Sequence, residues 1–485
     1  MAAATEAAQH AGASGGLARM SASSLLEGYR SGRFTPTQVI EEVIAALERA
    51  DRHCRVMVTP MFDAARAQAE LATKAWAGCG RARALEGVPV TVKDLVYVAG
   101  VPALGGSPAH RGFVPAADAA VVTRLREAGA IITCKTTTCE AGYKLTADSP
   151  VSGVTRNPWN PARTSGGSSG GAAAAVAAGC GPLAVGTDGV GSIRVPASFC
   201  GVVGIKPTFG LVPRAPGFTP PSWASLAHTG PIARTVGDLA LLLEVLAGYD
   251  RRDAASLPLP GRRFDTRPGS LAGLRIACSA DLGYAAVAPE VRSAFAAAVS
   301  LLQRLGAQVV PDAPDIDPAV LEHTLRPIAY VEQAAAALER DAASMACSEA
   351  EYRAVVEHGR HYSGIEYVDA THRRAALRAA FVRLFDRVQV LVTPTVATTA
   401  FAAGEIGVDE IDGREVDRHL GWSPFSWPMN LAGLPALTIN CGFDAAGLPV
   451  GLQIVAPWLD EDVILRVAAA FEAASDVSGR WPSLA

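Results

Sequence analysis

No run of about 18 consecutive apolar residues, the length that a helix needs to cross a bilayer, occurs in this 485-residue chain. The Ala-rich stretch at 172–179 is short and bounded by glycine, so we expect no membrane span. Basic clusters are also missing, since 43 Lys and Arg stand against 47 Asp and Glu and give a net charge of −4. A nucleic-acid partner is therefore not expected.

The nine cysteines show no CxxC spacing. Cys200, Cys278 and Cys441 lie in apolar runs, which is typical of buried thiols in a reducing compartment, so we expect a cytoplasmic protein. No pair of cysteines or histidines has a metal-ligand spacing. His358 and His361 come closest, and such a pair more often belongs to a solvated helix face. We therefore expect neither a metal nor another cofactor.

Residues 1–18 are rich in Ala and Gly, and they lack the basic start and the apolar core of a signal peptide. We expect a disordered tail there, followed by one large domain at 19–485. Within that domain, apolar strands alternate with helical patterns, which favours an α/β fold with a central mixed sheet between helices. Residues 310–385 are expected to be mostly helical.

Two Gly/Ser-rich turns, GGSSGG at 166–171 and GTDGVGS at 186–192, each present a serine. The chain between Ser168 and Ser192 fits a helix of about four turns through AAAAVAAG and a short strand, PLAVG. The spacing thus lets two hydroxyls meet in one pocket. The glycines let several backbone N–H groups converge, as the stabilisation of an oxyanion requires.

A nucleophilic serine needs a base, and no histidine lies in or near either turn. The apolar strand VPVTV at 88–92 instead delivers Lys93 at its end. Burial would lower the pKa of this lysine and favour the neutral amine, which can accept a proton. Ser–Lys arrangements are a known variant of the serine nucleophile scheme.

These residues and several further segments make the chain resemble the amidase signature family. The matching segments run in the family's order over nearly the whole length of the chain. The segments are GVPVTVKD around Lys93, TRNPWNP at 155–161, GGSSGG, GTDGVGSIRVPASFCGVVGIKPT, GPIARTVGDLALLLEVLAG at 230–248, LVTPT at 391–395 and NLAGLPALTINCGFDAAGLPVGLQIV at 430–455.

The resemblance implies a serine amidase that works through an acyl-enzyme. In it Ser192 is the nucleophile, Ser168 is a bridging serine whose peptide is cis, and Lys93 is the base. The implied oxyanion hole consists of the backbone N–H groups of Gly189, Val190 and Gly191.

The second turn departs from the family's commonest form, since Val190 occupies a position where glycine is frequent. Its methyl groups are expected to form a wall beside the acyl site.

Asp188 and Arg194 flank the nucleophile, and we interpret them as a structural ion pair, with direct substrate contact as the alternative. Cys139 and Tyr143, in a segment that lines the substrate channel in relatives, are candidate substrate-binding residues.

Aromatic residues are dense between 401 and 429. Trp422, Phe425 and Trp427 either line an apolar pocket, which would favour aryl or longer acyl groups, or cover the core; the sequence leaves both open.

The substrate class indicated is a small amide, with an aryl amide or a carbamate (urethane) as narrower candidates. The main alternative is the glutaminase component of a tRNA-dependent amidotransferase. Against that alternative, the segment that usually recognises glutamine there is not recognisable in 310–385. An inactive amide-binding scaffold is a further alternative, and a homodimer is left open.

Overall fold

The computed structural model describes residues 16–78, 82–219, 222, 225–259, 261–338, 340–477 and 479–484. The tail expected at residues 1–18 falls mostly outside the described residues. Its last residues belong to the fold, because Leu17–Arg19 forms a 3-10 turn (η2) in which Ala18 is buried.

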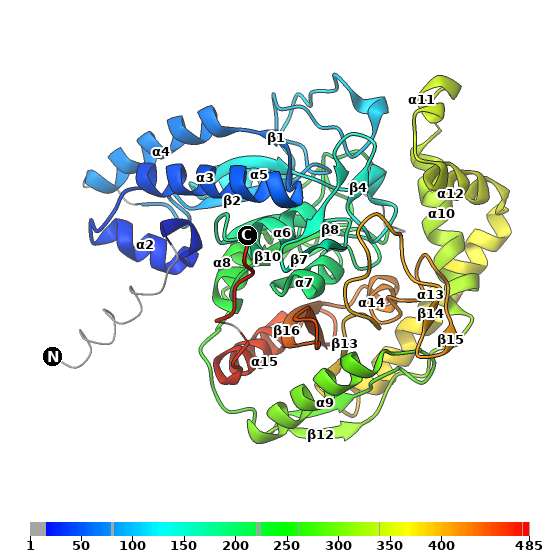
Figure 1. Cartoon of the computed structure of the whole chain (residues 1–485). Helices are drawn as coiled ribbons and strands as arrows, with labels where there is room; N and C mark the ends of the chain where they lie inside the picture. Colours follow the sequence, from blue (N-terminus) through cyan, green and yellow to red (C-terminus); the bar gives the residue numbers. More distant parts are fainter. Residues whose placement is uncertain are drawn as a thin grey trace.

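Within the described residues, eleven strands form one mixed sheet in the order β1-β3-β2-β8-β10-β9-β16-β17-β13-β11-β12 (Figure 1). These strands are β1 (Met57–Pro60), β2 (Pro89–Lys93), β3 (Ile131–Thr136), β8 (Leu183–Asp188), β9 (Val203–Lys206), β10 (His228–Ala233), β11 (Arg275–Cys278), β12 (Gln308–Pro311), β13 (Val390–Pro394), β16 (Ala436–Phe443) and β17 (Pro449–Val455). Three short ribbons lie outside the sheet: β4 (Asp148–Ser149) with β5 (Gly153–Val154), β6 (Arg156–Asn157) with β7 (Asn160–Thr164), and β14 (Glu410–Ile411) with β15 (Arg414–Glu415). The predicted central mixed sheet is confirmed.

Helices surround the sheet. They are α2 (Ala22–Arg30), α3 (Pro36–Cys54), α4 (Phe62–Ala77), α5 (Ala120–Glu127), α6 (Gly170–Ala177), α7 (Arg194–Cys200), α8 (Val236–Leu246), α9 (Pro289–Arg304), α10 (Arg326–Ala336), α11 (Ala342–Ala346), α12 (Ala350–His361), α13 (Gly364–Phe385), α14 (Trp427–Ala432) and α15 (Glu461–Ala474). Single turns η3 (Pro108–His110) and η4 (Glu140–Gly142) and a π-helical turn, η5 (Leu321–Leu325), complete the set.

The alternation of side chains along the strands places helices on both faces of the sheet. In β8, Leu183 and Val185 belong to a core cluster with residues of α5, α8, α9 and α15. Ala184, which points the other way, belongs to a second cluster with α3, α6 and α7. A third cluster, under α13 and α14, continues that second face. The sheet is thus buried on both faces by apolar side chains. Polar groups are therefore expected at the ends of its strands.

Local signals in the sequence explain several boundaries. Thr35 caps α3 through a capping box with Gln38, ahead of Pro36 at the first helical position. The helix expected to run about four turns through AAAAVAAG is shorter than predicted, because α6 has eight residues. It ends at Ala177, and Gly179 just beyond it has a φ of +78°, in the left-handed region that terminates helices.

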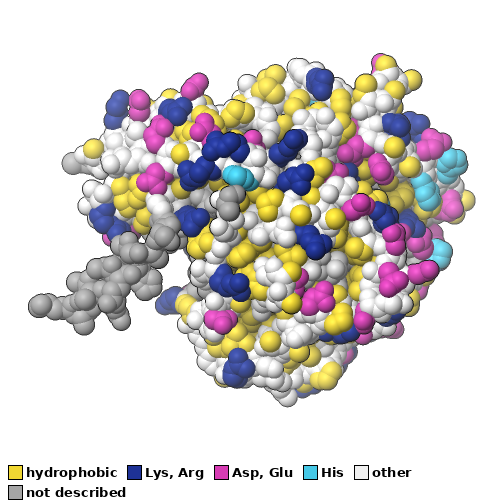
Figure 2. Space-filling view, viewed as in Figure 1, with side chains coloured by type: hydrophobic (Ala, Val, Ile, Leu, Met, Phe, Trp, Pro, Cys, Tyr) yellow, Lys and Arg dark blue, Asp and Glu magenta, His cyan; other side chains and the backbone are white. Residues whose placement is uncertain are grey.

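The region 310–385 is largely helical, as predicted, and α10, α11, α12 and α13 lie together at the opposite side of the molecule from α2, α3 and α4 (Figure 1). On the face shown in Figure 2, basic and acidic side chains are intermingled with apolar ones, and no single sign of charge covers that face. None of the helices in the described part of the chain is both long and apolar enough to cross a membrane.

Candidate active site

Lys93 is the last residue of β2, and its side chain is completely buried. Its Nζ lies 2.7 Å from Ser168 Oγ and 2.8 Å from Thr187 Oγ1, with the Thr187 carbonyl oxygen at 3.4 Å. Because β2 and β8 pair in parallel, their carboxyl ends reach the same edge of the sheet, and Thr187 comes beside Lys93. The sequence predicted the strand and the lysine at its end but not the threonine.

Desolvation lowers the pKa of Lys93 from 10.5 to about 7, although Cys139 and Asp188 act in the opposite direction. Near neutral pH, a large share of this lysine is therefore the neutral amine. A neutral amine has a lone pair that can accept a proton from the Ser168 hydroxyl.

The turn that carries Ser168 is bound to the turn that carries Ser192. The peptide between Gly167 and Ser168 is cis, as the resemblance implied. The N–H of Ser169 donates to the Ser192 carbonyl oxygen at 3.0 Å, and Ser169 Oγ donates to the Thr187 carbonyl oxygen, also at 3.0 Å. Both Ser168 and Ser192 are buried, and no hydrogen bond joins their two hydroxyls within the described part of the structure.

The turn at 186–192 carries Ser192, the expected nucleophile, and is called the nucleophile turn below. It offers backbone donors, but not quite the expected set. The N–H of Gly191 donates to Asp188 Oδ1 at 2.8 Å, so this donor is already engaged. The N–H groups of Gly189, Val190 and Ser192 have no acceptor among the residues that the structure describes. The free donors are therefore on both sides of Gly191, and they remain available to an oxyanion.

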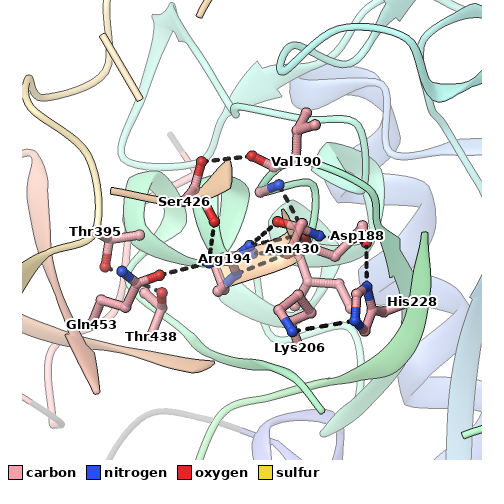
Figure 3. A network of polar contacts seen from close by, with 12 residues as sticks. Asp188, Val190, Arg194, Lys206, His228, Thr395, Ser426, Asn430, Thr438 and Gln453 are labelled. Carbon is pink, nitrogen blue, oxygen red and sulfur yellow. Dashed lines mark hydrogen bonds and ion pairs between the residues drawn. The ribbon is translucent and has the colours of Figure 1, made fainter. Parts of the chain in front are cut away.

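Asp188 holds this turn by accepting bonds along it (Figure 3). Besides Gly191, the N–H of Ile193 donates to Oδ2 at 3.1 Å. Arg194 donates from Nε to Oδ2 and from Nη2 to Oδ1, each at 3.0 Å, so the expected ion pair forms with two parallel bonds. Both side chains are completely buried, which favours the structural role over direct substrate contact.

The pKa of Asp188 reflects this pairing. Burial alone would raise it, but the charge of Arg194 and the hydrogen bonds from Arg194 and Asn430 outweigh burial and hold the pKa well below its usual range. Asp188 is therefore a carboxylate at neutral pH. A buried carboxylate with this many donors fixes the backbone around it.

Arg194 extends the network to the C-terminal segments (Figure 3). It donates to the Ser426 carbonyl oxygen at 2.8 Å, to Gln453 Oε1 at 2.7 Å and to Asn430 Oδ1 at 2.6 Å. The Ser426 hydroxyl donates to the Val190 carbonyl oxygen at 2.6 Å. Asn430 and Gln453 lie in segments that resembled the family, but nothing in their residue types or spacing assigned them to this network.

A histidine does lie next to the nucleophile turn, contrary to the prediction. His228 Nδ1 is 3.3 Å from the Asp188 carbonyl oxygen and 2.8 Å from that of Leu226. The antiparallel pairing of β10 with β8 places His228 opposite Asp188, 40 residues away in the chain. Its Nε2 lies 3.3 Å from Nζ of the buried Lys206. His228 therefore contacts the backbone of this turn at Asp188. No motif around His228 in the sequence indicated this position.

The aromatic residues singled out in the sequence lie in the core. Trp422 and Phe425 have no exposed surface and Trp427 is 2% exposed. Trp422 stacks on Phe199 with ring centroids 5.8 Å apart. Val190 is half-buried and packs against the same cluster, so these rings lie beneath Val190 in the core.

Cys139 and Tyr143 flank the short turn η4 (Glu140–Gly142), which lies beside Ser168. A Cβ built on Gly142 would be 3.4 Å from Ser168 Oγ. Cys139 is completely buried, and its thiol donates to the Lys144 carbonyl oxygen at 3.4 Å. Tyr143 donates its hydroxyl to Glu349 at 2.9 Å. Both side chains thus form hydrogen bonds within the protein.

The arrangement can move a proton from a serine hydroxyl to a buried amine, and it can present backbone N–H groups to a developing oxyanion. No group of three or more potential metal ligands occurs in the described part of the chain.

Comparisons with known proteins identify related chains. The sequence profile described as Amidase matches residues 38–465. An acylamidase of Rhodococcus erythropolis is 34% identical, over 96% of this chain and 97% of that protein. The A subunit of the glutamyl-tRNA(Gln) amidotransferase of Synechococcus sp. (strain RCC307) is 36% identical, over 93% of this chain and 97% of that protein. The crystal structure of a bacterial aryl acylamidase of the amidase signature family superposes with a TM-score of 0.87 at 28% identity, covering 95% of this chain and 99% of that chain.

The chain belongs to the amidase signature family. It is an amidase, a hydrolase that acts on amide C–N bonds.

Proposed function

We propose that this amidase cleaves its substrate through an acyl-enzyme, with Ser192 as the nucleophile, Ser168 as the proton relay and Lys93 as the base. The observation that carries the proposal is the 2.7 Å contact between the buried Lys93 amine and the Ser168 hydroxyl, in the turn that is bonded to the turn of Ser192. A hydroxyl can donate and accept at once, which is what a relay needs.

In the proposed reaction, Ser192 Oγ forms a bond to the substrate carbonyl carbon. Its proton passes to Ser168, and the Ser168 proton passes to neutral Lys93. The carbonyl oxygen becomes an oxyanion that the free N–H groups of Gly189, Val190 and Ser192 stabilise. When the C–N bond breaks, the proton returns through Ser168 to the leaving amine. Water then attacks the acyl-enzyme by the same relay and releases the acid.

The substrate is proposed to be an aryl amide or a carbamate (urethane) with an apolar acyl side. Val190, at the nucleophile turn, supports the apolar acyl side, because its side chain packs against the apolar cluster that contains Trp427. Each buried methylene favours binding by about 0.8 kcal/mol, so three or four extra carbons should raise kcat/KM by one to two orders of magnitude. A series of p-nitroanilides from acetyl to hexanoyl measures this, and a flat or falling series would mean that the acyl site is small.

The test of the function is a panel of amides, esters and carbamates, with glutamine included, given to the purified chain. Release of aniline or alcohol by wild type and not by Ser192→Ala is the expected result. Turnover that persists in Ser192→Ala, or no turnover of any panel member with no covalent label from a fluorophosphonate, would overturn it and favour an inactive scaffold.

A second candidate function is the glutaminase component of an amidotransferase, and the 36% identity to the Synechococcus amidotransferase chain favours it. It predicts ammonia release from glutamine only when partner subunits of the amidotransferase are added. Amide hydrolysis by the lone chain, without any response to glutamine, would exclude it.

We also propose a reducing compartment such as the cytoplasm for this protein. The eight cysteines in the described residues are free thiols, and five of them are buried.

A further inference from the structure

Four aromatic side chains form a cluster that the sequence did not single out. Phe218 stacks on His110 at a centroid distance of 4.6 Å and meets Tyr97 edge-on at 5.0 Å. Phe113 lies 5.4 Å from Tyr97 and 5.9 Å from Phe218. We call these four residues the aromatic rim.

The aromatic rim is accessible where the core aromatics are not. Phe113 is 38% exposed, and Tyr97, His110 and Phe218 are half-buried. Burial lowers the pKa of His110 and outweighs the hydrogen bond between its Nδ1 and the Leu104 carbonyl oxygen at 3.0 Å, which acts in the opposite direction, so the uncharged ring is favoured. Four uncharged rings with accessible surface are suited to contact another aromatic ring.

A series of close neighbours leads from the rim to Ser168. A Cβ built on Gly105 would lie 3.0 Å from the Phe218 ring and 3.4 Å from Leu95 Cδ2. The other methyl of Leu95, Cδ1, would lie 2.9 Å from a Cβ on Gly142, which in turn would be 3.4 Å from Ser168 Oγ. Leu95 is half-buried and stands between Ser168 and Phe218.

The same strand end that carries Lys93 holds the rim in place. The Asp94 carboxylate accepts the N–H groups of Leu104 and Gly105 at 3.0 and 2.8 Å. The Gly105 carbonyl oxygen accepts the N–H of Ala141 at 2.8 Å, which ties this loop to the turn beside Ser168. The backbone of this loop is therefore fixed to the end of β2 and to the turn beside Ser168, which restrains the part of the rim that the loop carries.

The rim lies on the leaving-group side of the site. Ser168 is the group that returns the proton to the leaving nitrogen, so that nitrogen must come within hydrogen-bond reach of its hydroxyl. A substituent on the nitrogen then extends past Gly142 and Leu95. The acyl part is then assigned to the nucleophile turn, where Val190 packs against the core cluster.

We propose that the aromatic rim of Tyr97, His110, Phe113 and Phe218 is a subsite for an aryl group on the leaving amine, so that the preferred substrates are amides or carbamates of aromatic amines. This inference rests on the proposed function, because it takes the leaving-group side from the role of Ser168.

The test compares N-phenylpropanamide with propanamide, which share the acyl group. For each enzyme the ratio of the two kcat/KM values is measured, and this ratio is then compared with that of wild type, which cancels the intrinsic reactivity of the two amides. Loss of a ring contact of this kind should lower the ratio by about tenfold in Phe218→Ala and several-fold in Phe113→Ala. The exposed Tyr249→Ala is the matched control and keeps the wild-type ratio.

A ratio that stays within about twofold of wild type in both rim variants, with both amides hydrolysed, overturns the subsite and leaves the proposed function standing. An equal loss of kcat/KM on both amides also overturns the subsite, because such a loss would be a structural effect of the substitution. The proposed function itself fails if wild type hydrolyses neither amide and a fluorophosphonate does not label Ser192.

Discussion

A buried lysine has two opposite roles open to it, and its protonation state selects between them. As an ammonium, Lys93 can only donate to Ser168 and Thr187. As a neutral amine it can accept the proton that Ser168 must pass on. The complete burial of the side chain favours the second state, because desolvation penalises the charged form.

This balance predicts the pH dependence of activity. In the proposed mechanism the protonated form of Lys93 is inactive, so kcat/KM should rise with pH, with a midpoint set by its pKa of about 7 and a plateau above. Thr187→Val removes an acceptor that stabilises the ammonium, so the midpoint should move to lower pH. The measurement is kcat/KM between pH 5 and 10 with chemistry shown to limit the rate. A rate independent of pH over that range would exclude Lys93 as the base.

Ser192 carries the second prediction at this scale. Ser192→Ala should lower kcat by at least about 10³-fold, because the relay and the backbone donors act only through that oxygen. Mass spectrometry after treatment with a fluorophosphonate should place the label on Ser192. A label on another residue would contradict the assignment.

Elements are joined at the site by buried charges. Asp188 ends β8 and Arg194 begins α7, so their ion pair closes the turn that carries the nucleophile. Removing one partner of a buried pair leaves the other charge buried without compensation. The loss of stability is then larger than the net stabilisation that the intact pair provides.

Arg194→Met should therefore lower the free energy of unfolding by about 3–5 kcal/mol. The matched control is Arg387→Met, which breaks a largely exposed pair with Asp312 and should cost under about 1 kcal/mol. Urea unfolding followed by circular dichroism measures both. Equal losses in the two variants would mean that the buried pair does not support the turn.

Glu140 attaches the helical region to the site and was not recognised in the sequence. Its buried carboxylate accepts bonds from Ser107 Oγ at 2.6 Å, Arg340 Nη1 at 2.9 Å, Ser348 Oγ at 2.7 Å and the N–H of Glu349 at 3.0 Å. One side chain in η4, beside Ser168, thus holds the segment between α10 and α12.

Glu140→Ala should loosen that segment before the rest of the molecule. The loss of about 2 kcal/mol of local stability corresponds to roughly thirty-fold faster amide hydrogen exchange in residues 342–361. Glu357→Ala, on the exposed side of α12, is the control and should leave exchange unchanged. Acceleration spread evenly over the whole chain in Glu140→Ala would argue against a local attachment.

Over the whole molecule, burial decides which thiols react. Cys347 is exposed, while Cys54, Cys134, Cys139, Cys180 and Cys200 are buried. Burial raises the pKa of Cys134 and of Cys139 to about 12, so little thiolate is present at neutral pH.

Iodoacetamide at pH 7.5 should therefore modify Cys347 first among the described cysteines, and the five buried thiols only after urea is added. Peptide mapping measures this. Early modification of Cys139, next to the catalytic turn, would contradict its burial.

Local chemistry determined much of this protein. The apolar strand ending in Lys93, the two glycine-rich turns with their serines, the cap at Thr35 and the pairing of Asp188 with Arg194 all follow from residues close together in the chain. Their signals are short-range, since periodicity, capping and glycine conformation act over a few residues.

The tertiary structure alone decided the rest. His228 lies behind Asp188 because β10 pairs with β8, and Thr187 reaches Lys93 because β8 pairs with β2. Which aromatic rings are accessible was decided in the same way: Trp422 is covered by Phe199 and its cluster, whereas Phe218 is only partly covered. Strand pairing and burial depend on segments that are far apart in sequence, and no local pattern specifies which segments meet.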